Sequence, residues 1–144
     1  MIQPKLVLIG AGGHSRSCID IIERLGEFEI AGLIGMPNEL HQSSLTYNII
    51  GTDPDLYDLV EKYQNAFIAV GQIKTAKPRI LLYKLVKKIG FKLPTFIAPS
   101  ADISPHAVIG EGSIVMPGAV VNAGAVIGKN CIINSKALVE HDVK

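Results

Sequence analysis

Apolar and polar residues follow two different patterns along the chain, and the first part combines buried runs with helical spacing. Lys5 to Ile9 (KLVLI) form an apolar run typical of a strand buried in a parallel sheet. Strands are expected at residues 5–9, 28–34, 48–51 and 66–70, and helices at residues 17–25, 53–63 and 78–89. This alternation predicts an α/β unit with a parallel sheet.

Residues at the ends of the expected helices define their boundaries. Gly26 and Gly90 follow helical patterns and predict helix ends, because glycine readily adopts the left-handed backbone found there. Asp53 and Pro54 predict a helix start, with the aspartate as N-cap and the proline at the first helical position. A polar loop is expected over residues 35–47.

From Ile97 to Lys144 the pattern changes to a repeat of six residues. The residue four positions after the start of each hexad is small in seven of the eight hexads, and Gly, Pro and Asn gather between these positions as corner residues. So short a period predicts a stacked coil in which each apolar residue is buried against neighbouring repeats. The first position of every hexad is a β-branched aliphatic residue: Ile97, Ile103, Ile109, Val115, Val121, Ile127, Ile133 and Val139.

The two patterns predict two domains in this chain of 144 residues. The α/β domain is expected at residues 1–92, with a junction at residues 93–96 around Leu93-Pro94-Thr95. Eight hexads fill residues 97–144, and the pattern is still running at Lys144. We therefore expect an incomplete, truncated coil.

Composition narrows the possible partners. Apolar residues make up 48% of the chain, charged residues 19%, and the net charge is +1, so nothing indicates binding to nucleic acid or to an anionic membrane. No apolar run reaches the length of a membrane helix, and Met1 to Lys5 lack the features of a signal peptide. Two cysteines, Cys18 and Cys131, indicate no disulfide framework. We expect a reduced, cytoplasmic protein.

A glycine-rich turn, Gly10 to Ser15 (GAGGHS), joins the first expected strand to the first helix. Backbone N–H groups in such a turn can approach a phosphate at the helix N-terminus. The third glycine of the dinucleotide fingerprint is absent, and no carboxylate follows the second strand until Glu39, which argues against an NAD-type ribose clamp. The turn predicts a site for a phosphate or for another nucleotide. The alternative is a tight turn that only packs helix on strand, with His14 and Ser15 capping the helix.

His141 is the second candidate, because it stands at the third position of its hexad and therefore at a corner outside the core. Asp142 follows directly, and a carboxylate beside a histidine can fix the tautomer and raise the basicity of the ring. The pair is a candidate general base. The alternative is an exposed histidine without a chemical role.

Metal chemistry is not expected. The repeat contains two histidines, His106 and His141, and no third partner, whereas zinc sites use three or four ligands.

Five segments, in this order and spacing, resemble a known family over essentially the whole chain. They are Val7 to Ser15 (VLIGAGGHS), Ile50 to Asp53 (IGTD), Ala69 to Gly71 followed by Arg79, Phe96 to Ala101 (FIAPSA), and Asn134 to Asp142 (NSKALVEHD). The family is that of the bacterial nucleotide-sugar acetyltransferases, which include sialic-acid O-acetyltransferases and the N-acetyltransferases of bacillosamine and perosamine synthesis.

The resemblance implies a small Rossmann-like α/β domain followed by a left-handed parallel β-helix with three hexads in each coil. It implies a homotrimer with active sites between neighbouring β-helices. It also implies that the N-terminal domain binds a nucleotide-linked sugar and that acetyl-CoA is the co-substrate. By this match the nucleotide-sugar site consists of Gly10, Gly12, Gly13, His14, Ser15, Gly71 and Gln72.

The resemblance assigns the catalytic base to His141 and its acidic partner to Asp142, in direct acetyl transfer within a ternary complex. Two departures stand out. Residues 35–39 (GMPNE) replace the Asp pair that contacts the nucleotide in the family, and the repeat ends three residues after His141 where relatives continue. We therefore expect this chain to lack much of the acetyl-CoA site. The alternative function is a non-catalytic nucleotide-sugar-binding and oligomerisation module.

Overall fold

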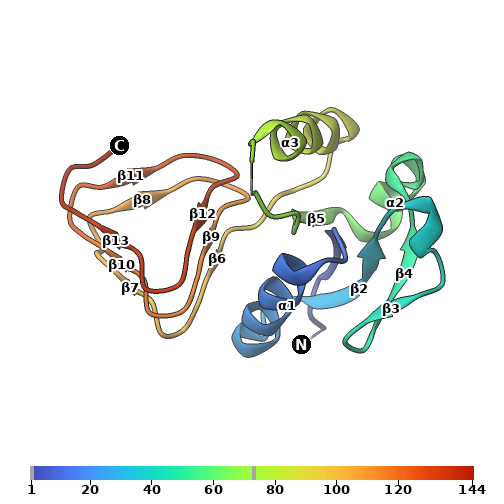
Figure 1. Ribbon diagram of the computed structural model, residues 1–144, viewed down its shortest axis with the longest axis horizontal. Coiled ribbons are helices and arrows are strands. Elements are labelled where there is room, and N and C mark those ends of the chain that lie inside the picture. Colours follow the sequence, from blue (N-terminus) through green and yellow to red (C-terminus); the bar gives the residue numbers. More distant parts are fainter. Residues whose placement is uncertain (1, 73) are drawn as a thin grey trace. The chain divides into compact units, whose positions relative to one another are not determined.

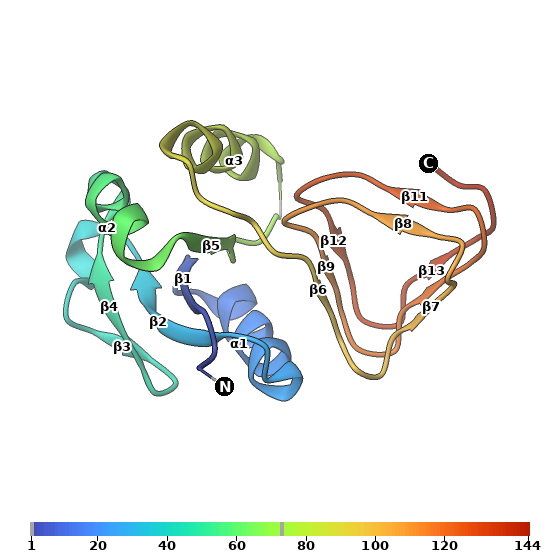
Figure 2. The same cartoon turned by 180° about the vertical axis from the view of Figure 1, so that it is seen from behind.

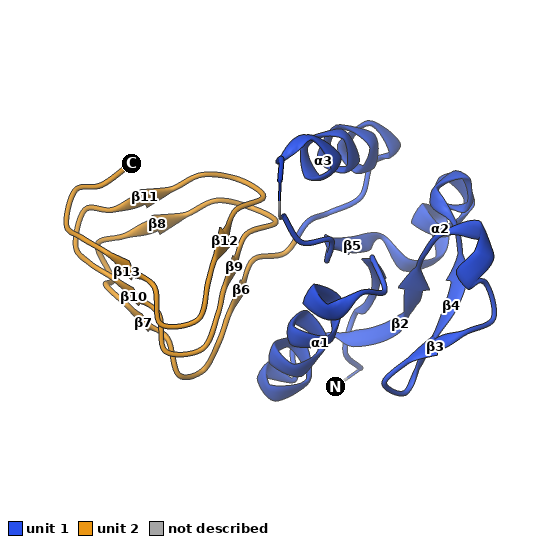
Figure 3. Ribbon diagram, viewed as in Figure 1, with its two compact units in different colours: residues 1–93 blue, residues 94–144 orange. Residues whose placement is uncertain are grey.

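The computed structural model describes residues 2–72 and 74–144, and it is seen from two sides in Figures 1 and 2. The chain divides into two compact units, Met1–Leu93 and Pro94–Lys144, which Figure 3 colours separately. The first unit is α/β and the second is built of short parallel strands. No helix within the described ranges is long and apolar enough to cross a membrane.

The first unit contains a five-stranded sheet with the order β3-β4-β2-β1-β5. Its parallel strands are β1 (Lys5–Ile9), β2 (Glu29–Ile34), β4 (Tyr47–Gly51) and β5 (Asn65–Ile68). Its helices are α1 (Gly13–Leu25), α2 (Leu56–Tyr63) and α3 (Lys77–Ile89). The predicted parallel α/β sheet is confirmed.

Helices cover both faces of this sheet, with α1 on one face and α2 and α3 on the other (Figures 1 and 2). Val7 and Ile9 of β1 pack in one buried cluster with Leu56 of α2 and Val86 of α3. Side chains alternate across a strand, so Leu6 and Leu8 face the other side of the sheet, and they are also fully buried. Burial on both faces explains why β1 is an uninterrupted apolar run.

The segment expected to be a polar loop has more structure than predicted. It contains the 3-10 helix η1 (Pro37–Glu39) and the short strand β3 (Ser43–Ser44), which pairs antiparallel with β4. The prediction of a loop was therefore wrong here. A strand of two residues carries too little hydrophobic alternation to be detected in the sequence.

Helix ends were predicted better than helix starts. Gly26 and Gly90 adopt left-handed backbone angles at the ends of α1 and α3, as expected. The predicted N-cap at Asp53 was wrong, because the 3-10 helix η2 (Asp53–Asp55) precedes α2 and Thr52 is its N-cap. The Thr52 N–H donates to Asp55 Oδ2 at 2.7 Å. Helix α1 begins at Gly13 rather than at residue 17, since the end of the glycine turn is itself helical.

The second unit is a left-handed parallel β-helix in which each hexad contributes one two-residue strand. The strands are β6 (Phe96–Ile97), β7 (Asp102–Ile103), β8 (Val108–Ile109), β9 (Ile114–Val115), β10 (Val120–Val121), β11 (Val126–Ile127), β12 (Ile132–Ile133) and β13 (Leu138–Val139). Residues 18 positions apart pair directly, as Val120 does with Asp102 and with Leu138. Three hexads therefore form one coil, as expected.

The inner side of the β-helix is filled by the first residues of the hexads and by small residues at the corners. Val121, Ala125 and Ile127 are buried, and Ile109 and Val139 pack against them. Because coils are a fixed strand spacing apart, each inner residue stacks on the residue 18 positions away. The hexad pattern therefore follows directly from the packing of the core.

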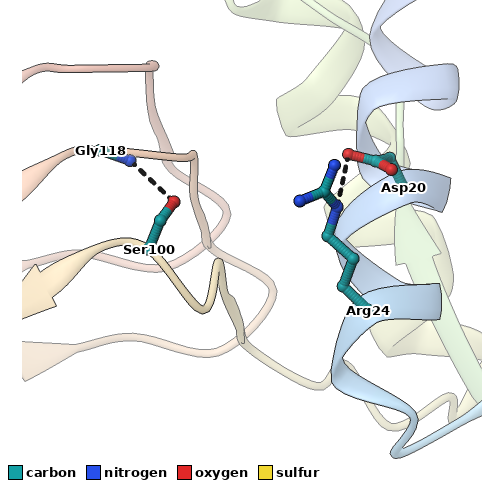
Figure 4. A network of polar contacts seen from close by, with 4 residues as sticks. All are labelled: Asp20, Arg24, Ser100 and Gly118. Carbon is teal, nitrogen blue, oxygen red and sulfur yellow. Dashed lines mark hydrogen bonds and ion pairs between the residues drawn. The ribbon is translucent and has the colours of Figure 1, made fainter.

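The fourth residue of each hexad has left-handed backbone angles at six successive corners. These residues are Gly112, Gly118, Gly124, Asn130, Lys136 and Asp142, with φ between 56° and 77°. At an earlier corner the Ser100 hydroxyl accepts a hydrogen bond from the Gly118 N–H at 3.2 Å, as Figure 4 shows. The same figure shows the exposed Asp20–Arg24 ion pair of α1, which is worth little in water.

The Ser113 side chain links two successive coils of the β-helix. Its buried hydroxyl donates to the Gly128 carbonyl at 2.7 Å and accepts from the Cys131 N–H at 2.9 Å. Ser113→Ala leaves both groups unpaired, so we expect it to lower the free energy of unfolding by roughly 1–3 kcal/mol. Denaturant unfolding followed by circular dichroism measures this change. The matched control is Ser100→Ala at an exposed corner, and an equal loss there would contradict the expectation.

Candidate functional site

The glycine turn lies at the carboxyl end of β1, between β2 and β5. Gly10 has φ +124°, and a Cβ atom on it would lie 2.9 Å from the Ala69 oxygen. The Gly10 N–H donates to the Ile34 oxygen at 2.8 Å. The chain runs from β1 to β2 on one side and returns to β5 on the other, so the turn occupies a topological switch point. Ligands of open α/β sheets bind at such points.

The outer side of the turn is open. Gly12 and Gly13 are exposed, and no described atom lies within 4 Å of a Cβ placed on either of them. Helix α1 begins here with Gly12 as its N-cap; no described side chain caps it, and its first turn contains no acidic residue. An uncapped helix N-terminus beside open space of this kind favours an anion.

The predicted residues His14 and Ser15 differ in their surroundings. The Ser15 side chain is fully buried, and its hydroxyl donates to the Gly12 carbonyl at 2.7 Å. This bond shapes the turn, and the helix has Gly12 as its N-cap rather than the His14 or Ser15 side chain of the alternative interpretation. His14 is half-buried, with Nε2 3.4 Å from Cys18 Sγ.

Burial and a neighbouring cation keep His14 neutral. Burial lowers the pKa of His14, and the charge of Arg79 lowers it further. Burial raises the pKa of the Cys18 thiol to about 12. His14 is therefore an uncharged polar group at neutral pH, and Cys18 is not a nucleophile.

Gly71 and Gln72, the two later residues assigned to this site, lie in the loop after β5. Gly71 lies against His14, because a Cβ on Gly71 would be 3.2 Å from His14 Cβ. Gln72 is exposed. The structure thus brings Gly71 to the glycine turn.

Arg79 is a buried residue that entered the sequence analysis only as part of the family resemblance. It lies in the first turn of α3, is 2% exposed, and its Nη1 donates to the Ile68 and Val70 oxygens at 3.2 and 2.6 Å. These bonds fix the carboxyl end of β5. Its burial carries no signal in the sequence, where it resembles any polar residue near a helix start.

His141 and Asp142 form a pair at a corner of the β-helix. His141 Nδ1 lies 3.0 Å from Asp142 Oδ2, and the two side chains are 76% and 77% exposed. Asp142 adopts left-handed backbone angles, with φ 61°. Because Nδ1–H donates to the carboxylate, Nε2 of the neutral ring is left with a free lone pair.

The carboxylate also sets the basicity of the ring. The hydrogen bond with Asp142 raises the pKa of His141, the charge of Asp142 raises it further, and Glu140 adds a smaller effect. A histidine held in this way is able to accept a proton at Nε2. No group of three or more His, Cys, Asp or Glu side chains that could hold a metal occurs among the residues the structure describes.

Comparison with protein families assigns both units. Residues 5–79 match the family described as the PglD N-terminal domain. Residues 106–141 match the bacterial transferase hexapeptide, a family unit of six repeats. No curated protein matches the chain significantly.

Solved structures are similar over nearly the whole chain. The acetyltransferase domain of PglB from Neisseria gonorrhoeae, in complex with acetyl coenzyme A, is 35% identical with a TM-score of 0.84, over 97% of this chain and 66% of that one. PerB from Caulobacter crescentus, in complex with CoA and GDP-perosamine, is 34% identical with a TM-score of 0.87, over 96% and 63%.

A histidine-to-asparagine variant of perosamine N-acetyltransferase from Caulobacter crescentus, in complex with CoA and GDP-perosamine, is 33% identical with a TM-score of 0.88, over 96% and 63%. The chain thus spans less than two thirds of the length of each of these three proteins.

The His141–Asp142 bond predicts the effect of removing the carboxylate charge. In Asp142→Asn we expect the pKa of His141 to fall, because both the charged hydrogen bond and the nearby charge are lost. NMR titration of the imidazole ring measures the pKa of His141 in both proteins. Glu140→Gln is the control, with a smaller decrease expected from its lesser contribution. An unchanged pKa in Asp142→Asn would show that the pair does not form in solution.

Proposed function

Since the chain belongs to the family defined by the PglD N-terminal domain, we propose that it transfers the acetyl group of acetyl-CoA to an amino or hydroxyl group of a nucleotide-linked sugar. The observation that carries this proposal is the His141–Asp142 pair, in which a carboxylate holds Nδ1 and leaves Nε2 exposed on the β-helix. The match to the bacterial transferase hexapeptide covers residues 106–141, ends at His141, and supports the assignment.

The acetyl group moves directly from CoA to the acceptor. Nε2 of neutral His141 takes the acceptor proton while the acceptor nitrogen or oxygen attacks the thioester carbonyl carbon. A C–N or C–O bond forms, the C–S bond breaks, and the imidazolium returns the proton to the CoA thiolate. Asp142 orients the ring and stabilises its charged form in between.

A direct route agrees with the surroundings of the two cysteines. Cys18 is fully buried and its thiol has a raised pKa of about 12, so it cannot carry the acetyl group. Cys131 is half-buried in the wall of the β-helix, with its Sγ 3.4 Å from the Lys129 oxygen. Packing accounts for both residues.

The similar proteins support an acceptor that is a sugar amine on a nucleoside diphosphate. PerB was solved with CoA and GDP-perosamine, and the PglB domain with acetyl coenzyme A. We propose that the open glycine turn at Gly12 and Gly13 receives the diphosphate, through backbone N–H groups at the start of α1. Acetyl-CoA is the proposed co-substrate, no metal takes part, and the active assembly is a homotrimer.

In this proposal the residues of the first unit have different roles in nucleotide binding. Gly12, Gly13 and His14 present the backbone of the helix start, and Gly71 closes the turn from the β5 side. Gly10 and Ser15 build the turn, through close packing and through the bond to the Gly12 carbonyl. Gln72 is exposed beyond Gly71, where it can reach the sugar or base.

The first test replaces the proposed base. In His141→Asn we expect kcat to fall roughly 10²–10⁴-fold, the usual contribution of a general base. We expect KM to change little, because a histidine-to-asparagine variant of the similar perosamine enzyme still holds CoA and GDP-perosamine. CoA release is followed with GDP-perosamine, UDP-amino-sugars and CMP-sialic acid as acceptors.

His106→Asn is the matched control, since His106 is also an exposed corner residue of the β-helix. Full turnover in His141→Asn would exclude His141 as the base. Binding of a nucleotide sugar without binding of acetyl-CoA and without turnover would favour a non-catalytic binding module instead.

The second test blocks the glycine turn. Gly13→Leu places a side chain in open space at a helical position, where leucine is a good helix former, so stability is preserved. A hydrogen bond to a charged group contributes roughly 1.5–3 kcal/mol, so losing one weakens binding of GDP or UDP by about tenfold or more. Calorimetric titration measures the affinity. Ser17→Leu, exposed one turn later, is the control, and equal affinities in both variants would place the diphosphate elsewhere.

A further inference from the structure

Gly124 lies directly under Asp142, at the same corner one coil earlier. Both residues are the fourth of their hexads and have left-handed backbone angles, with φ 77° and 61°. The Asp142 N–H donates to the oxygen of Ala123, the residue before Gly124, at 3.0 Å. This hydrogen bond between successive coils therefore fixes the distance between the Asp142 backbone and the backbone at Gly124.

The Asp142 carboxylate occupies the space that a side chain on residue 124 would fill. A Cβ placed on Gly124 would overlap Asp142 Oδ1 and would lie 3.1 Å from Asp142 Cγ. The other oxygen, Oδ2, is 3.0 Å from His141 Nδ1. One carboxylate oxygen thus lies over the bare glycine while the other holds the imidazole.

We propose that Gly124 is a positioning residue for the His141–Asp142 pair: the missing side chain at residue 124 lets the Asp142 carboxylate fold down over the lower coil and reach His141 Nδ1. The catalytic consequence rests on the proposed function, whereas the orientation of the carboxylate does not. Gly124 touches neither the ring nor the reacting atoms and acts through Asp142 alone.

The neighbouring corner provides a comparison within the same chain. Gly118 has nearly the same backbone angle, with φ 73°, and the fourth residue of the hexad one coil later is Lys136. A Cβ on Gly118 would lie 3.3 Å from Lys136 Cγ, part of a flexible, exposed side chain. A side chain at either glycine costs the same backbone strain, but only at residue 124 does it displace a carboxylate that holds a histidine.

The test compares Gly124→Ala with Gly118→Ala, and its first readout is the pKa of His141 by NMR titration. The charged groups that bear on His141 are Asp142 and Glu140. We expect the pKa of His141 to fall toward its ordinary value in Gly124→Ala, because the Asp142 hydrogen bond is lost, and to stay unchanged in Gly118→Ala. An unchanged pKa in Gly124→Ala would overturn the proposal.

A second pair of variants repeats the comparison with a residue that disturbs folding less. Gly124→Asn and Gly118→Asn use the residue that best tolerates left-handed angles, and Asn130 already occupies such a corner in this chain. The asparagine at residue 124 still carries a Cβ, so the fall in the pKa of His141 is again expected only there. The thermal midpoints of each pair should match, which separates strain from positioning.

Kinetics and a double variant connect the position of Asp142 to catalysis. In Gly124→Ala we expect kcat to fall by roughly 10- to 100-fold, a part of the roughly 10²–10⁴-fold that a positioned general base contributes, with KM unchanged. Asp142→Ala removes the overlapping atoms, so adding Gly124→Ala to it should cause no further loss. A full additional loss in the double variant would overturn the proposal. A shifted pKa in a chain without acetyl transfer would retain the positioning role and reject the proposed function.

Discussion

The stacking of coils 18 residues apart is the constraint on which the second unit depends. A backbone that turns every six residues must keep its N–H groups bonded to the coil below, and it meets this demand with left-handed angles at successive corners. Glycine accepts such angles freely, and asparagine and aspartate tolerate them better than other residues. The corner geometry thus places Asp142 beside His141, and a structural requirement of the coil becomes an arrangement suited to proton transfer.

In the first unit the corresponding constraint is the close approach of two strand ends. Gly10 leaves no room for a side chain because the turn runs against the Ala69 carbonyl at the end of β5. Arg79 fixes that same strand end through the Ile68 and Val70 oxygens. With both sides held, the start of α1 is fixed in place, and no side chain of the described residues caps it. A rigid support of this kind is what an anion site at a helix terminus requires.

The sequence predicted those features that depend on repetition or on apolar burial. The hexads specified the β-helix because each inner residue stacks on an equivalent one, and the run at β1 specified a sheet covered on both faces. Features that depend on single contacts were not predicted from the sequence. Thr52 caps η2 through Asp55, where Asp53 with Pro54 was the stronger local signal, and β3 is too short for any period. The positions of Ser15 and Arg79 follow from contacts with main-chain carbonyls, which leave no pattern in the sequence.

The pKa values of the two histidines of the candidate sites shift in opposite directions, for different physical reasons. Burial and Arg79 lower the pKa of His14, so the glycine turn must attract an anion through backbone N–H groups and the helix dipole rather than through a histidine cation. Asp142 raises the pKa of His141, yet this exposed pair adds little to stability, since water screens exposed ion pairs. The pair therefore has no structural reason to be held in one geometry, and the coil nevertheless holds it, with the carboxylate resting on a residue that has no side chain. Orientation of the ring, rather than stabilisation of the fold, is what this corner provides.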